Sequence, residues 1–141
     1  MWVVDTCIVL DILEHDPAFG RPSAELLQKL LPQGLTISPV TMVELSAAFS
    51  GDLAEQKRFL DLAGISYQEL WTAADTELAC GAWNVYVVAK RQSQTAKRPV
   101  ADILIGGFAA NRTGLVTRNP RDFSRWFPRL RMHAPSVPGT M

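Results

Sequence analysis

Three acidic residues stand in apolar stretches that lie far apart in the sequence. Asp5 ends the stretch WVVD, Glu44 lies inside PVTMVELSAAF, and Asp102 lies near the start of VADILIGGFAAN. Burying an unpaired carboxylate costs several kcal/mol, roughly, so each group should be neutralised, paired with a cation or bound to a metal. Carboxylates without His or Cys partners favour a hard divalent cation, Mg²⁺ or Mn²⁺, over zinc.

The residues around Glu44 predict a helix without a polar side. At about 100° per residue, Glu44 falls close to Val40 and Ala47, while Met42 and Leu45 make the opposite side apolar as well. We therefore expect this helix to be buried and the Glu44 carboxylate to have a charged partner. Two alternatives stay open, namely a salt bridge to an Arg and a position at the lip of the helix where the carboxylate reaches water.

The other two acids also have ordinary structural explanations. Asp5 could cap the helix that follows it, and Asp102 could be a first-turn acid that the helix dipole favours. These explanations would have to hold separately at each place, whereas one shared cation accounts for all three acids. We therefore interpret Asp5, Asp102 and Glu44 as ligands of one metal ion.

Stretches with the length of strands alternate with stretches of helical length along the chain. Strands are predicted at residues 2–5, 35–38, 65–70 and 115–117, with an edge strand in the tail after residue 128. Helices are predicted at residues 7–16, with Thr6 as the cap, and at 21–34, 39–49, 52–63, 72–94 and 100–111. The alternation predicts an α/β fold of three layers, with a central, mostly parallel sheet flanked by helices. In such a sheet the ligand site lies beyond the carboxyl ends of the strands, where Asp5 and Asn119 fall.

The composition is that of one globular domain over residues 1–141, with a loosely ordered tail from about residue 133. Of the 141 residues, 48% are hydrophobic and 20% are charged. No apolar stretch reaches the roughly 18 residues of a membrane span, and the first residues lack the basic region of a signal peptide. We expect a cytoplasmic protein that does not enter a membrane. Cys7 and Cys80 lack the spacing of a metal site and are expected to be thiols in the core.

The charges are distributed unevenly between the two halves of the sequence. Residues 1–80 contain 12 acidic residues against 4 basic ones, a balance of −8, and residues 81–141 contain 10 basic residues against 2 acidic ones, a balance of +8. The two halves could pair with each other inside the fold. A basic face that binds a polyanion is the other reading.

Four spaced segments of the sequence form a recognisable set, namely VVDT, TMVEL, VADILI and LVTRNPRDF. Together they resemble the PIN-domain family, and most of all the small VapC-type toxins of bacterial type II toxin-antitoxin systems, and the resemblance covers nearly the whole chain. It implies a magnesium-dependent endoribonuclease that hydrolyses RNA with a metal-activated water. It also implies a PIN-like fold, a homodimer, and a cognate antitoxin protein that occupies the active-site groove.

The resemblance implies roles for single residues as well. Asp5 and Asp102 would be the principal metal ligands, and Glu44 would be a further ligand or would orient the attacking water. Thr6 and Thr117 would hold those carboxylates or the scissile phosphate. Contacts with the RNA backbone would come from the arginines that flank the acidic segments, for which internal pairing is the alternative: Arg98, Arg118 and Arg121.

One position departs from the family pattern. Many PIN domains have an Asp two residues after the Thr of the last of these segments, where this chain has Asn119, and Asp122 follows three residues later. An amide can donate a ligand oxygen or hold a water, but it contributes no negative charge. Asn119 is therefore a candidate catalytic residue at a site that is expected to hold a second metal ion poorly.

Other classes of protein also place an acid after the first strand. An aspartyl phosphatase would have a second Asp two residues after Asp5, where this chain has Cys7. A receiver domain would have an acid pair and a Lys at the end of the last strand, where this chain has the letters TRN. The remaining alternative is a noncatalytic or weakly catalytic PIN-fold protein that binds nucleic acid or a partner.

Overall fold

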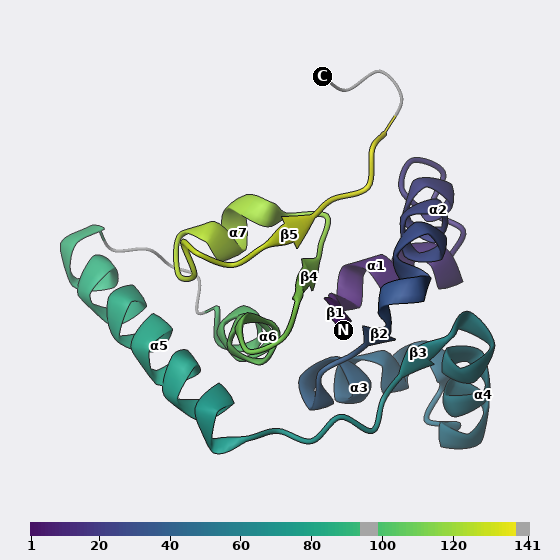
Figure 1. Cartoon of the computed structure of the whole chain (residues 1–141), viewed down its shortest axis with the longest axis horizontal. Helices are drawn as coiled ribbons and strands as arrows, with labels where there is room; N and C mark the ends of the chain where they lie inside the picture. Colours follow the sequence, from purple (N-terminus) through teal and green to yellow (C-terminus); the bar gives the residue numbers. More distant parts are fainter. Residues whose placement is uncertain (94–98, 138–141) are drawn as a thin grey trace.

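The computed structural model describes the backbone of residues 1–93 and 99–137, and it shows a five-stranded sheet between layers of helices (Figure 1). The strand order is β3-β2-β1-β4-β5, and every neighbouring pair is parallel. The strands are short: β1 (Trp2–Val4), β2 (Leu35–Thr36), β3 (Ile65–Ser66), β4 (Gly114–Val116) and β5 (Met132–His133). The strand order reverses between β1 and β4, which is where open α/β sheets bind their ligands.

Two groups of helices cover the two faces of the sheet. One face carries α1 (Thr6–Leu13), α2 (Gly20–Leu30) and α4 (Leu53–Ala63), and the other carries α6 (Val100–Ala110) and α7 (Pro120–Ser124). The long helix α5 (Ala73–Ser93) packs on α6, away from the sheet (Figure 1). The remaining helical segments are α3 (Pro39–Glu44) and the 3₁₀ helices η1 (Leu31–Gln33) and η2 (Leu45–Phe49).

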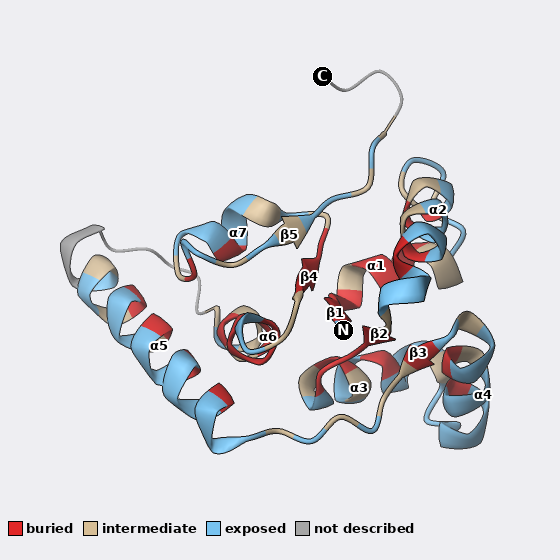
Figure 2. Cartoon of the chain, viewed as in Figure 1, coloured by how far each residue is buried: buried red, intermediate tan, exposed pale blue. Residues whose placement is uncertain are grey.

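The central strand shows why the sheet needs cover on both faces. Trp2 and Val4 point into the cluster made with α1, α2 and α4, whereas Val3 points into the cluster made with α6 and α7. All three side chains are buried, and Figure 2 shows the same pattern for β1, β2 and β4, with exposed outer sides on the helices. A strand that is buried on both faces is a continuous apolar run, which is why the letters WVV predict a strand.

The predicted α/β class with three layers is confirmed, and the sheet is wholly rather than mostly parallel. The strands predicted at residues 35–38 and 65–70 are shorter in the structure, and the prediction for the first helix is wrong in two details. The helix after β1 is capped by Asp5 rather than by Thr6, which is its first residue, and it ends at Leu13 instead of continuing to residue 16. The tail does contribute the edge strand β5, and residues 134–137 have neither helix nor strand.

The cysteines are both free, but only one has the predicted environment. Cys7 is half-buried, whereas Cys80 is exposed on α5. The prediction for Cys80 is wrong because α5 packs on α6 through one stripe of side chains, which includes Ala79, Ala82 and Tyr86, and leaves its other sides in solvent. In the described part of the chain, no helix has both the length and the apolar character needed to cross a membrane.

Candidate active site

Asp5 lies at the carboxyl end of β1, at the point where the strand order reverses. Its Oδ1 accepts a hydrogen bond from the Thr6 backbone N–H at 2.8 Å, so the carboxylate does cap α1. Its Oδ2 accepts a hydrogen bond from the Thr117 hydroxyl, just after β4, at 2.8 Å and a longer one from the Cys7 thiol at 3.4 Å. The cap is therefore only half of its environment, because the second oxygen turns toward the neighbouring strand.

The electrostatic environment of Asp5 is unfavourable to its charge. Burial raises the pKa of Asp5, the negative charge of Glu44 raises it further, and the hydrogen bonds from Thr117, Cys7 and Thr6 only partly offset this. Burial and the charge of Asp5 raise the pKa of the Cys7 thiol to about 12, so Cys7 stays protonated at neutral pH. A bound cation would relieve the unfavourable charge of Asp5.

Glu44 lies beside Asp5, but it is not buried. It is the last residue of α3 and is exposed, and Val43 next to it is 72% exposed. The prediction of a helix buried on all sides is wrong because α3 is only six residues long and packs through one side before the chain tightens into η2. Of the two alternatives named for this acid, the position where the carboxylate reaches water is the one observed.

A chain of hydroxyl groups holds Glu44 in place. The Thr6 hydroxyl lies 2.7 Å from Glu44 Oε1 and 2.9 Å from the Thr41 hydroxyl, which in turn lies 3.4 Å from the Ser38 hydroxyl. An ionised carboxylate can only accept, so the single proton of Thr6 goes to Glu44, and Thr41 then donates to Thr6. Thr6 therefore contacts both acids, because its hydroxyl donates to Glu44 and its backbone N–H donates to Asp5.

Thr41 is a site residue that the sequence interpretation missed. Its side chain is fully buried, and its backbone N–H donates to the Ser38 cap at 3.1 Å. The available signal was a Thr three residues after a Ser-Pro helix start, which places its hydroxyl on the same side as the cap.

Asp102 lies in the first turn of α6 and is half-buried. Helix α6 packs on both α3 and β1, which carry Glu44 and Asp5 at or next to their ends. Among the described residues, however, no group of three His, Cys, Asp or Glu side chains is close enough to hold a metal ion together. The structure thus brings Asp5 and Glu44 together, and the three-acid metal site remains a prediction.

The loop after β4 supplies the other predicted residues on this edge. The Thr117 hydroxyl, which donates to Asp5, accepts a hydrogen bond from the Asn119 backbone N–H at 3.1 Å. Asn119 is exposed, and its side chain makes no capping hydrogen bond to α7. Asp122 is exposed in the first turn of α7. Thr117 therefore links Asp5 to the position at which this chain departs from the family pattern.

The three arginines that were predicted to bind RNA have different surroundings. Arg118 donates through Nη1 to both carboxylate oxygens of the buried Asp11 at 3.2 Å, and its guanidinium lies 4.7 Å from the centre of the Phe19 ring. Arg121 is exposed and makes no side-chain ion pair within the described residues, whereas Arg98 lies outside the described residues. For Arg118 the alternative of internal pairing is therefore the one observed.

The residues at this edge suit a hard cation. The available side-chain donors of Asp5, Glu44, Thr6 and Thr117 are all oxygens. Within residues 1–90 and 99–137, for which side chains are described, no Lys, Arg or His forms an ion pair with Asp5 or Glu44. Two neighbouring carboxylates without a cationic partner in that part of the chain fit a divalent ion.

The wholly parallel sheet, its strand order and its helical layers define a PIN-like α/β fold. A chain of VapBC2 from Rickettsia felis, from a crystal structure of VapBC2 bound to a DNA fragment from their promoter, shares this fold with a TM-score of 0.67. The two chains are 18% identical, and the match covers 96% of this chain and 98% of the other. The resemblance to PIN domains is thus confirmed for the fold. No family model matches the sequence, and no curated protein matches it.

Proposed function

We propose that the protein is a metal-dependent endoribonuclease of the VapC type. The observation that carries this proposal is the buried Asp5 carboxylate, which lies where the strand order reverses and has Glu44 beside it. Neither acid has a cationic partner among the described side chains. A pair of acids in such surroundings suits metal-assisted hydrolysis better than it suits the stability of the fold.

Asp5, Asp102 and Glu44 would hold the cation, which is Mg²⁺ or Mn²⁺ in this proposal. When bound, such an ion lowers the pKa of a water molecule and stabilises negative charge on the leaving 3′ oxygen of a phosphodiester. The Thr117 hydroxyl fixes Asp5 by donating to Asp5 Oδ2, and the Thr6 hydroxyl fixes Glu44 by donating to Glu44 Oε1. Because Glu44 is exposed, its free oxygen can accept a hydrogen bond from the attacking water and so orient it.

The proposed function includes two protein partners, an antitoxin and a second copy of the chain. The shared fold with a chain of the VapBC2 structure supports a cognate antitoxin as a binding partner. A homodimer is a separate expectation, which comes from the resemblance of the sequence. A candidate gene for the antitoxin would lie next to this one. Copurification of the two products, with loss of ribonuclease activity in the complex, tests this part of the proposal.

The proposed activity can be tested directly on an RNA substrate. Wild-type protein is incubated with a mixture of structured RNAs and Mg²⁺, and the products are separated by size. We expect discrete fragments with 5′-phosphate and 3′-hydroxyl ends, no cleavage in EDTA, and recovery on excess Mg²⁺. Cleavage that persists in EDTA would contradict the proposal.

A second candidate function is a noncatalytic PIN-fold protein that binds nucleic acid or a partner. Two observations favour it, namely Asn119 in place of the commoner Asp and the lack of a three-acid group among the described residues. On this reading, RNA or a partner would bind without being cut, and Mg²⁺ would not alter the RNA. The cleavage assay separates the two functions.

We expect Asn119→Asp to strengthen Mn²⁺ binding by roughly tenfold, about 1.4 kcal/mol. The new carboxylate would lie next to Thr117, which already contacts Asp5. The variant should also be slightly less stable without metal, because one more negative charge joins the cluster. Calorimetric titration measures the Mn²⁺ affinity of wild type and of the variant. Equal affinities would place residue 119 outside the metal site.

The two described arginines should respond differently to removal. Arg118→Ala leaves Asp11 buried and unpaired, so we expect the free energy of unfolding to fall by about 1–3 kcal/mol. Arg121→Ala should leave stability unchanged. It should reduce the slope of log K for RNA binding against log salt concentration by about 0.7, the value for one phosphate contact on a single strand. Denaturant unfolding measures the effect on stability, and RNA binding at several salt concentrations measures the slope. A slope that changes for Arg118→Ala and not for Arg121→Ala would make Arg118, rather than Arg121, the residue that contacts RNA.

A further inference from the structure

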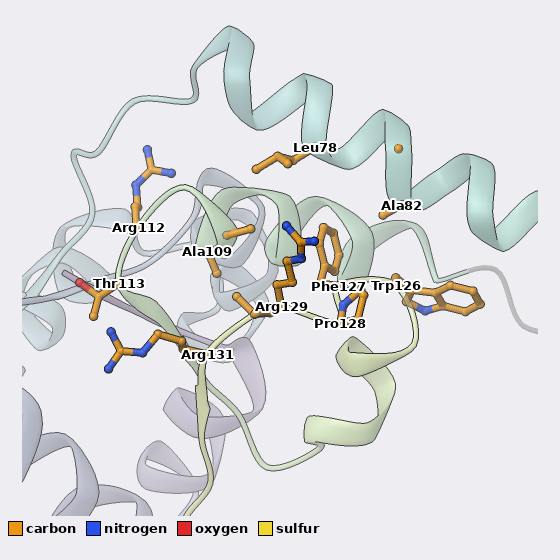
Figure 3. A pocket seen from close by; sticks show the side chains of 13 residues that line it. Leu78, Ala82, Ala109, Arg112, Thr113, Trp126, Phe127, Pro128, Arg129 and Arg131 are labelled. Atoms are coloured by element: carbon orange, nitrogen blue, oxygen red, sulfur yellow. The ribbon is translucent and has the colours of Figure 1, made fainter.

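A cavity of about 450 Å³ opens at the edge of the sheet opposite to Asp5. Its walls come from α5, from the end of α6, from the turn before β4 and from the segment between α7 and β5, as Figure 3 shows. Arg131 lies just before β5 and Thr113 just before β4, so this is the edge at which the parallel strands begin. The cavity is therefore separate from the proposed active site.

Small side chains leave room along one wall of this cavity. Gly81 and Ala82 of α5 line it, together with Ala109 and Ala110 of α6. A Cβ atom built on Gly81 would have no atom within 4 Å, so a side chain at this position can be added without disturbing the packing. This cavity, which is open beside Gly81, forms a groove between α5, the end of α6 and the segment before β5.

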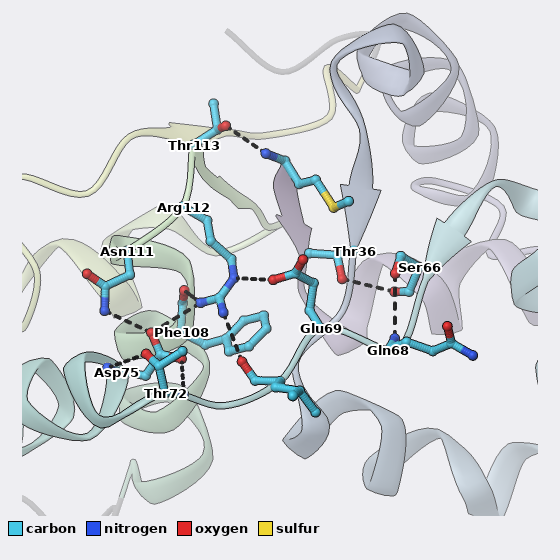
Figure 4. Close-up of polar contacts among 12 residues, drawn as sticks. Thr36, Ser66, Gln68, Glu69, Thr72, Asp75, Phe108, Asn111, Arg112 and Thr113 are labelled. Carbon is cyan, nitrogen blue, oxygen red and sulfur yellow. Dashed lines mark hydrogen bonds and ion pairs between the residues drawn. The ribbon is translucent and has the colours of Figure 1, made fainter.

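Arg112 fixes one end of the groove and is not available to a ligand. Its guanidinium pairs with Asp75 at 3.1 Å and with Glu69 at 3.2 Å, and it donates to the backbone carbonyls of Phe108 at 2.6 Å and Leu70 at 3.1 Å (Figure 4). Four such contacts satisfy most of the donors of one arginine. Its charge is matched by two acids, so it serves the structure.

The other two arginines of the groove have no such partners. Arg129 and Arg131 are exposed, and neither forms an ion pair with a described residue. Arg131 lies over the Trp2 ring, with 5.5 Å between its guanidinium carbon and the ring centre. None of the described residues that line the cavity is Asp or Glu. The groove therefore has uncompensated positive charge beside an apolar wall.

A second cavity continues the groove. It measures about 540 Å³ and shares Arg112, Thr113 and Arg131 with the first. Its lining also includes Glu69, which pairs with Arg112, so Arg131 is the shared arginine that has no ion pair with a described residue.

We propose that this groove binds an acidic peptide segment of a partner protein, with one large apolar side chain in the cavity and flanking carboxylates on Arg129 and Arg131. Single-stranded nucleic acid is the less suitable polyanion, because its bases need open aromatic faces. Of the aromatic residues in the lining, Phe127 is buried, and Trp126 has the Arg125 guanidinium over its ring and stands perpendicular to the Tyr86 ring. The charge of the groove and the lack of an open ring both point to a peptide.

Selection from a random phage-displayed dodecapeptide library tests the proposal, with wild-type protein as the target and Arg129→Glu for counter-selection. We expect the enriched peptides to contain a large apolar residue flanked by at least two acidic residues. Enrichment of neutral or basic peptides, or of none, would overturn the proposal.

Paired variants then test the site with a synthetic copy of an enriched peptide. Gly81→Glu and Gly81→Lys add side chains of similar length and opposite charge beside the groove, so the first should weaken binding at least about tenfold and the second should not. Arg129→Glu should weaken it to a similar extent, whereas Arg121→Glu, near the other edge, should not. Equal losses of peptide affinity in the two Gly81 variants would show that the charge of the groove does not select the ligand.

Two controls separate this groove from other uses of the surface. Asp5→Asn should bind the peptide as tightly as wild type does, and a loss there would place the peptide in the active-site groove instead. The peptide should not displace a bound single-stranded RNA, and sedimentation of Gly81→Glu should match wild type. Displacement of RNA, or a changed oligomeric state, would assign the groove to RNA or to a second copy of the chain.

Discussion

Replacing Asp5 by Asn is expected to reduce RNA cleavage by at least about a thousandfold, which corresponds to roughly 4 kcal/mol of lost transition-state stabilisation. Asn keeps an oxygen that can accept from the Thr6 backbone N–H, so the cap of α1 survives. What the variant loses is the negative charge beside Glu44. The loss should therefore appear in the rate of cleavage and not in the fold.

The matched control for this variant is Asp52→Asn. Asp52 also caps a helix, since its side chain accepts from the Glu55 backbone N–H at 3.1 Å at the start of α4, but it is exposed. The same chemical change there should leave cleavage unchanged. Equal activities of wild type and Asp5→Asn, with both variants folded by circular dichroism, would exclude Asp5 from catalysis.

Replacing Asp102 by Asn is expected to have the second large effect, on the response of stability to metal. Without metal the melting temperature should change little, because Asp102 does not form one group with Asp5 and Glu44 in the structure. At a Mn²⁺ concentration of about 100 times its Kd, wild type should gain about 2.7 kcal/mol, or about 5–10 °C, and the variant should lose most of this gain. Thermal unfolding with and without Mn²⁺ measures both effects, and equal gains would remove Asp102 from the metal site.

The same experiment has an expected pH dependence. The pKa of Asp5 is raised in the folded protein, so the metal-free protein loses stability as pH rises from the ordinary carboxyl pKa through the folded one. Mn²⁺ binds the ionised carboxylate, so its stabilising effect should grow over the same interval. A Mn²⁺ effect that is constant across this interval would mean that Asp5 does not bind the ion.

The fold was predictable because its signals are local. A short apolar run predicts a buried strand, and Ser38 followed by Pro39 predicts the start of α3, which the structure confirms. The place of Asp5 at the end of β1 follows from the same run. These features depend on neighbouring residues, so the sequence contains most of the information that fixes them.

The environment of single side chains was less predictable because it depends on packing between distant segments. Glu44 is exposed because α3 packs through one side only, which no periodicity within the segment reveals. Arg118 pairs with Asp11, which lies 107 positions away in the sequence. The contact of Thr41 with Thr6 exists because the fold brings α1 and α3 side by side, which neither segment shows by itself.

The most direct test of the proposed metal site is a crystal structure of the protein soaked in Mn²⁺, with anomalous diffraction to locate the ion. We predict one Mn²⁺ in contact with the carboxylates of Asp5 and Asp102, with Glu44 bound directly or through a water molecule. This requires Asp102 to join the other two acids when the cation binds. Manganese that occupies a different place, or that contacts Asp5 while Asp102 stays apart, would contradict a site shared by the three acids.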